Sequence, residues 1–88
     1  MSTRLTREDQ LANVLWDTVE TRKSEIRRTA YGPHIIEGID LMIERGWLDF
    51  DMARFEANVI GSLRNESNNS RMRALLAVWT AYANWKAV

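Results

Sequence analysis

The side chains best suited to chemistry follow His34, the only histidine of the chain. A row of carboxylates comes after it at helical spacing, formed by Glu37, Asp40 and Glu44. Paired carboxylates can serve as general acid and base or bind a divalent cation through oxygen ligands. This row lies opposite the isoleucines of the same segment, so we expect water to surround it, whereas catalysis needs a carboxyl group in a site of low dielectric. The row therefore predicts a solvated helix face without a catalytic or metal-binding role.

Other reactive arrangements are missing from the sequence. The absence of cysteine excludes disulfides, thiolate metal sites and cysteine nucleophiles. The four glycines are scattered and form neither a dinucleotide fingerprint nor a phosphate-binding loop. The order His34-x-x-Glu37 is the reverse of the motif found in di-iron helix bundles. We therefore expect a protein that is not an enzyme and that needs no cofactor and no metal.

Charge is balanced over the whole chain. Twelve basic side chains accompany twelve acidic ones, so no overall field draws the protein to nucleic acid or to anionic lipid. The first nine residues lack the apolar run of a signal peptide, and no stretch approaches the roughly 18 apolar residues of a membrane span. These features predict a cytoplasmic protein without a membrane partner.

Basic residues are nevertheless concentrated in two segments, which suggests nucleic-acid binding as an alternative function. An aromatic ring among cations can stack on bases and hold phosphates. The candidate contacts are Trp16, Lys23, Arg27, Arg28, Arg71 and Arg73. A helix-turn-helix around Gly46 is not supported, because residues 33–60 carry six acids against two arginines.

The elements that position these residues are predicted to be helices. No segment alternates apolar and polar residues for long enough to form a half-buried strand. Thr6 is expected to cap the first helix, Pro33 to lie in the first turn of the second, Gly46 to end it and Asp49 to cap the third. The sequence predicts an all-α, compact bundle of four helices with short connections, in a single domain of residues 1–88. The helices are expected at about 7–29, 33–45, 50–63 and 71–86.

Two charged residues interrupt the apolar stripes of these helices. Arg22 lies within the stripe of the first helix, and Glu56 lies within that of the third, which is formed by Met52, Val59, Ile60 and Leu63. A charge is costly to bury alone, so we predict a structural ion pair between Arg22 and Glu56. Two alternatives are that both side chains extend to water from the edge of their stripes, or that Arg22 makes its contact across a subunit interface.

The last helix is apolar over more of its circumference than a surface helix requires, about 220° against about 100°. The additional strip, with Val78, Tyr82 and Trp85, is predicted to contact another protein, because tryptophan and tyrosine are enriched at interface centres. The alternative is that this helix occupies the centre of the monomer. Trp16 lies off the core stripe of the first helix and is a further interface candidate, unless it is a wedge beneath a neighbouring helix.

The sequence therefore predicts a small non-enzymatic protein-binding module, an adaptor, regulator or inhibitor of a larger protein complex, and a homodimer through the last helix. The absence of catalytic groups and the excess of aromatic apolar surface support this hypothesis. The alternative is the nucleic-acid-binding regulator. A third hypothesis is an acidic mimic of nucleic acid that blocks a partner, formed by Glu37, Asp40, Glu44, Asp49 and Asp51.

Overall fold

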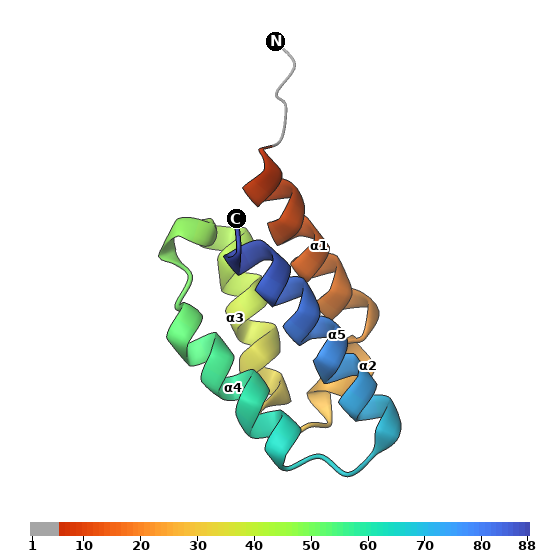
Figure 1. Cartoon of the computed structure of the whole chain (residues 1–88). Helices are drawn as coiled ribbons and strands as arrows, with labels where there is room; N and C mark the ends of the chain where they lie inside the picture. The colour runs from red at the N-terminus through yellow and green to blue at the C-terminus, as the bar shows by residue number, and fades with distance from the viewer. Residues whose placement is uncertain (1–5) are drawn as a thin grey trace.

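Five α-helices and one short 3₁₀-helix form the protein, in a computed structural model that describes residues 6–88 (Figure 1). The predicted domain covers 1–88, and its first five residues lie outside the described part. The elements are α1 (Arg7–Thr21), α2 (Lys23–Arg27), α3 (Gly32–Arg45), η1 (Trp47–Asp49), α4 (Met52–Arg64) and α5 (Asn69–Lys86). The four longer helices alternate in direction, which confirms the predicted all-α bundle.

The first predicted helix is divided in two at Arg22, whose backbone has φ −115° and ψ 17°. Its start is as predicted, because the Thr6 hydroxyl accepts from the Asp9 amide and the Asp9 carboxylate accepts from the Thr6 amide. Near its end, the Thr18 and Thr21 hydroxyls donate to backbone carbonyls four residues earlier, an interaction that bends helices. α2 therefore follows a new direction and packs against α3 and α5.

The other helix boundaries differ from the predictions by one or two residues. α3 begins at Gly32 and ends at Arg45, followed by Gly46, whose φ of 92° is favourable only for glycine. Asp51 caps α4 in place of Asp49, since its side chain accepts from the Arg54 amide at 3.0 Å. α5 begins two residues before the expected position because Asn68 accepts from the Arg71 amide at 3.1 Å.

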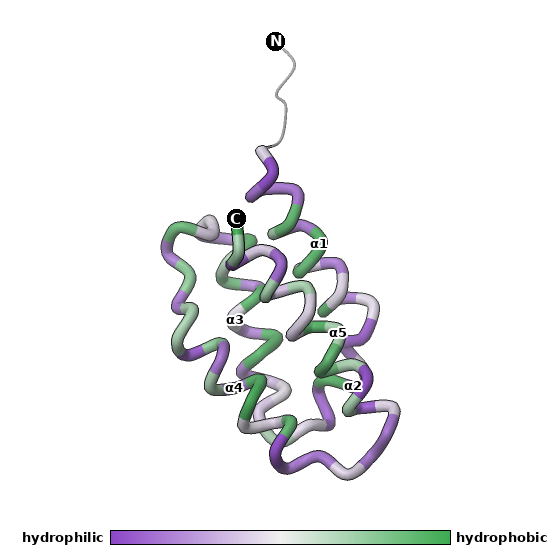
Figure 2. The backbone as a smooth tube through the Cα atoms, viewed as in Figure 1, coloured by the Kyte–Doolittle hydropathy of each residue, from purple (hydrophilic) through white to green (hydrophobic). Residues whose placement is uncertain are grey.

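The core lies between the helices, with α5 packed against α1, α2 and α4 (Figure 2). Val78, Tyr82 and Trp85 are only 0%, 1% and 3% exposed. The prediction that they contact another protein is therefore wrong, and the alternative of a central helix is confirmed. The reason is that α1, α2 and α4 surround α5 and bury a wider arc of its circumference than a surface helix would bury. The homodimer that we expected to form through this strip loses its basis.

The predicted ion pair between Arg22 and Glu56 is also wrong. One oxygen of the Glu56 carboxylate accepts from the Tyr82 hydroxyl at 2.7 Å and from Lys86 Nζ at 2.8 Å. These two bonds, that of Lys86 first, lower the pKa of Glu56 from its ordinary value. Arg22 lies at the bend between α1 and α2, where it is exposed and donates to the Thr21 hydroxyl at 3.1 Å. The neighbour of α4 on this side is α5, so Glu56 pairs with side chains of α5.

A helix crosses a bilayer only if it is long and apolar enough to span the hydrocarbon core. Among residues 6–88, no helix combines the length and the apolar character needed to cross a membrane.

Candidate functional site

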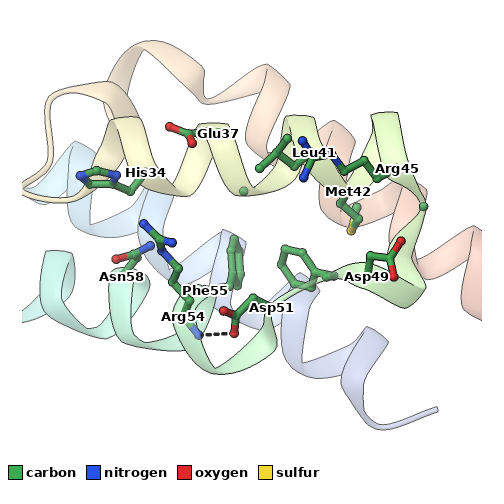
Figure 3. Close-up of a pocket in the computed structure, with 13 residues that line it drawn as sticks. His34, Glu37, Leu41, Met42, Arg45, Asp49, Asp51, Arg54, Phe55 and Asn58 are labelled. Atoms are coloured by element: carbon green, nitrogen blue, oxygen red, sulfur yellow. Dashed lines mark hydrogen bonds between the residues drawn. The ribbon is translucent and has the colours of Figure 1, made fainter.

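A groove of about 240 Å³ lies between the antiparallel helices α3 and α4, which pack against each other (Figure 3). Its floor is aromatic and aliphatic. Phe55 is buried, Phe50 is partly buried, and their ring centroids are 5.1 Å apart. Leu41 and Met42 of α3 complete the apolar lining. The Phe50 ring is thereby accessible from one side of the bundle, and the buried Phe55 ring lies beneath it.

Gly38 keeps this floor accessible. It lies in the interior of α3, where glycine is about 1 kcal/mol less favourable than alanine. A Cβ atom at this position would lie 3.8 Å from Phe55 Cδ1 and 3.9 Å from Phe50 Cε1. These are ordinary van der Waals distances, so a methyl group would fit and would lie against both rings. The sequence thus has a less favourable helix residue at the position where a larger one would fill the groove.

Polar side chains line the two ends of the groove differently. Figure 3 shows His34 at one end together with Arg54 and Asn58 of α4. Among residues 6–88, no hydrogen bond or ion pair engages the side chains of these three residues. Asp49 lies at the other end, and the Asp51 carboxylate is already used to cap α4. One end therefore offers free hydrogen-bond donors, and the other carries Arg45 beside the Asp49 carboxylate.

The carboxylates expected to form a solvated row are exposed, as predicted. His34, Glu37, Asp40 and Glu44 are all exposed. Within the described chain, no group of three or more histidine, cysteine or acidic residues could hold a metal ion. Of the five residues of the hypothetical acidic mimic, Glu37, Asp49 and Asp51 share the groove with Arg45 and Arg54. The acidic surface is therefore interrupted by arginines.

The predicted nucleic-acid contacts come together at one end of the bundle. α2 packs beside α5, and the Thr29 hydroxyl and the Tyr31 amide both bond to the Ser62 hydroxyl of α4. Residues 20–31 and 61–73 meet at this end and carry seven basic side chains against three glutamates. We call this region the basic end; besides the five predicted cations it contains Arg22 and Arg64.

The cations of the basic end are not all free. Lys23 lies 3.5 Å from the Glu20 carboxylate, and Arg71 lies 3.8 Å from that of Glu66. Arg27 faces α3 across a shallow hollow that Glu37 and Asp40 also line. Arg28 and Arg73 are exposed and form no ion pair within the described chain. Some of the positive charge is therefore neutralised locally.

Trp16 lies on the outside of α1 and is 37% exposed. It belongs neither to the core nor to the partly buried side chains packed against the core. Its expected position off the core stripe is confirmed, and its expected contact with a partner stays a prediction. Val14 and Leu76, each about half exposed, line a second and shallower groove between α1 and α5.

The sequence analysis did not identify the α3–α4 groove. Gly38 was the available signal, because a glycine in a helix interior often has a packing or functional reason. Phe55 was left out of the predicted stripe of α4, although it lies four residues before Val59 and shares its face. Arg54 and Asn58 gave no local signal, because their position at the groove depends on the pairing of α4 with α3.

Comparisons place the chain in no established group of proteins. No family model, no curated protein and no solved structure matches it. The groove and the basic end are therefore the two features from which a function can be inferred.

Proposed function

We propose that the protein is a small non-enzymatic protein-binding module, an adaptor, regulator or inhibitor, that takes a side chain of another protein into the α3–α4 groove. The observation that carries the proposal is Gly38, which leaves the partly exposed Phe50 ring accessible to a ligand above the buried Phe55 ring. Aromatic side chains surrounded by a polar rim are typical of the residues that contribute most to protein interfaces.

The size of the groove favours a side chain over a complete small molecule. Pockets that enclose drug-sized ligands usually have volumes of about 300–1,000 Å³. The α3–α4 groove, at about 240 Å³, is smaller and open along one side. A single large apolar side chain of a partner fits this space, with the rest of the partner segment resting on the polar rim. Recognition of an apolar anchor between two helices is an established mode of peptide binding.

The test is a peptide selection against the full chain, followed by binding to two matched variants. Gly38→Met fills the groove, whereas Ala83→Met adds the same side chain at an exposed position of α5 outside it. We expect the selected peptides to bind the wild type and Ala83→Met alike, and to bind Gly38→Met at least about tenfold more weakly, which corresponds to about 1.4 kcal/mol. Equal binding to all three proteins would contradict the proposal.

Nucleic-acid binding through the basic end is the second candidate function. Its support is that cations from two distant segments, Lys23, Arg27 and Arg28 of one and Arg71 and Arg73 of the other, meet at one end of the bundle. Phosphate binding requires this kind of local excess of cations.

Salt-dependent binding to duplex and single-stranded oligonucleotides tests this candidate. A protein that contacts phosphates loses affinity steeply as the salt concentration rises. Replacing both Arg28 and Arg73 with glutamine should lower the logarithmic salt slope by about two, whereas Arg7→Gln at the opposite end of the bundle should leave it unchanged. An affinity that does not depend on salt would exclude the candidate.

A further inference from the structure

We propose that the basic end binds single-stranded nucleic acid, with one base stacked on the Tyr31 ring and the neighbouring phosphates at the arginines around it. This inference rests on the second candidate function, which requires only phosphate contacts, and adds the class of nucleic acid and an aromatic contact. It follows from two segments distant in sequence that place one aromatic side chain among cations.

The Tyr31 ring lies directly against α4 at Gly61. A Cβ atom at Gly61 would be only 2.6 Å from Tyr31 Cε2 and 2.9 Å from Tyr31 Cδ2, so a larger residue would displace the ring. The Tyr31 amide donates to the hydroxyl of the buried Ser62 at 2.9 Å, which fixes the backbone beside the ring. Two contacts with α4 therefore determine where this ring lies.

Much of the Tyr31 side chain nevertheless stays open to solvent. Tyr31 is 42% exposed, although one edge of its ring contacts α4. Within residues 6–88, no other aromatic ring and no cation is stacked on it, and its hydroxyl forms no hydrogen bond. A ring that is already held in place can stack on a base with little further loss of conformational freedom.

Arginines flank the ring on both segments. Arg28 precedes Tyr31 by three residues, and Arg64 follows Gly61 by three, which places the Arg64 Cβ about 5–6 Å from the Cβ position of Gly61. Both arginines are exposed, and within the described chain neither side chain forms a hydrogen bond or an ion pair. Because every base of a strand is joined to phosphates, a base on the ring brings phosphates near these cations.

The charge of the basic end stays positive after its internal pairs are subtracted. Two of its seven cations pair with glutamates of the same region, and Arg27 faces two acids of α3 across a shallow hollow. The remaining cations are Arg22, Arg28, Arg64 and Arg73. Among residues 6–88, only one glutamate of the region lacks an ion pair, Glu25. This excess favours a polyanion, in contrast to the α3–α4 groove, where three acids accompany two arginines.

The exposed ring favours a single strand over a duplex. In a duplex, neighbouring base pairs cover the faces of the bases, whereas the unstacked bases of a single strand can lie on an aromatic side chain. Such stacking is tolerant of sequence, because every base has a π face. A basic surface without an accessible ring would bind either form through its phosphates alone.

Fluorescence anisotropy of labelled probes with the full chain tests the inference. The probes are oligothymidylate of about twelve nucleotides, an abasic strand of the same length and a duplex of the same length. We expect oligothymidylate to bind at least about fivefold more tightly than the abasic strand, and more tightly than the duplex. An oligouridylate of the same length distinguishes RNA from DNA as the source of the strand.

Two matched variants assign the effect to the Tyr31 ring. Tyr31→Leu retains an apolar contact with Gly61 but removes the ring, so it should bind oligothymidylate at least about fivefold more weakly. Tyr31→Phe preserves the ring and should bind like the wild type. The logarithmic salt slope should be the same in all three proteins, because none of the phosphate contacts is changed. A general disturbance of the basic end would reduce this slope as well.

The outcomes separate this inference from the second candidate function. Equal affinity for oligothymidylate and the abasic strand, or no loss in Tyr31→Leu, would overturn the inference, whereas binding that still weakens with salt would support the candidate. The absence of binding to every oligonucleotide would contradict both. Displacement of oligothymidylate by an equal concentration of an acidic peptide that contains tyrosine would overturn the inference in favour of a protein ligand at this surface.

Discussion

The two sides of α4 differ in how they meet their neighbours. Towards α5, the rings of Phe55 and Tyr82 lie 5.1 Å apart, and the Tyr82 hydroxyl and Lys86 Nζ both bond to Glu56. Towards α3, the same Phe55 faces Gly38 and contributes to an open groove. One helix thus takes part in a closed contact on one side and in an accessible one on the other.

This difference shows that side-chain size and polar pairing decide whether the contact between two helices is buried or stays open to solvent. Tyr82 fills the space beside α4 and satisfies its hydroxyl with a carboxylate, so the α4–α5 contact excludes water. Gly38 fills no space, and within residues 6–88 no hydrogen bond or ion pair engages the side chains of Glu37, Arg45 and Arg54 around it. We therefore expect substitutions on the α5 side to change stability, and those on the α3 side to change binding.

Phe55 belongs to both sides, and its replacement should have the largest effect. Phe55→Ala leaves a cavity between Tyr82 and Phe50, which should lower the free energy of unfolding by about 3–5 kcal/mol. Urea denaturation measures this change. A loss below about 1 kcal/mol would show that Phe55 is not a central part of the core. Binding of the selected peptides should also decrease under conditions in which the variant is still folded.

The closed side can be tested alone with Tyr82→Phe. The substitution removes the hydrogen bond to Glu56 and preserves the ring, so stability should fall by about 1 kcal/mol. Thermal unfolding followed by circular dichroism measures the effect. Affinity of the groove for the selected peptides should be unchanged, and a parallel loss of affinity would show that the two sides of α4 are not independent.

The open side should show the opposite combination of effects in Gly38→Ala. The new methyl group makes ordinary contacts with Phe50 and Phe55 and favours the helix, so the protein should gain up to about 1 kcal/mol in stability. The same methyl group narrows the groove beside the Phe50 ring and should weaken binding of the selected peptides. As a control, Ala57→Gly at an exposed site of α4 should cost a similar amount without affecting binding. A more stable variant with full affinity would contradict our interpretation of Gly38.

The smallest expected effect is the pH dependence contributed by Glu56. Its pKa is lowered in the folded protein by the bonds from Lys86 and Tyr82, so its contribution to stability is complete above the ordinary value of 4.5. That contribution is lost as the pH falls from 4.5 through the lowered pKa. Glu56→Gln should therefore be less stable than the wild type at neutral pH, and the difference should disappear in acid. A difference that is independent of pH would contradict the assignment.

Local signals in the sequence predicted the helices but not all of their boundaries. Thr6 and Gly46 were identified correctly because each is the only residue of its kind that fits the end of its helix. Asp49 was chosen as a cap although Asp51 has the same chemistry two residues later, and the choice depends on the geometry of η1. The bend at Arg22 was missed because the helical pattern of apolar residues continues through it.

The candidate site was less predictable, because it depends on which helices become neighbours. Glu56 was paired with Arg22 on the basis of stripe position, whereas the structure brings it to Lys86 of α5. Val78 and Trp85 were recognised as apolar, but their burial could not be inferred without knowing that three helices surround α5. The groove itself arises from the opposition of α3 and α4, two segments whose individual patterns predict only ordinary amphipathic helices.

The division at Arg22 has a consequence for the motion of the molecule. α2 has only five residues, too few to persist as an isolated helix, and its order depends on the buried Ile26 and on the bonds that tie residues 29 and 31 to Ser62. We therefore expect this corner to open more readily than α5, with amide hydrogens that exchange sooner. Gly38, Phe50 and Phe55 form the floor of the groove and lie outside α2. We therefore expect α2 to unfold and refold while the aromatic floor stays in place.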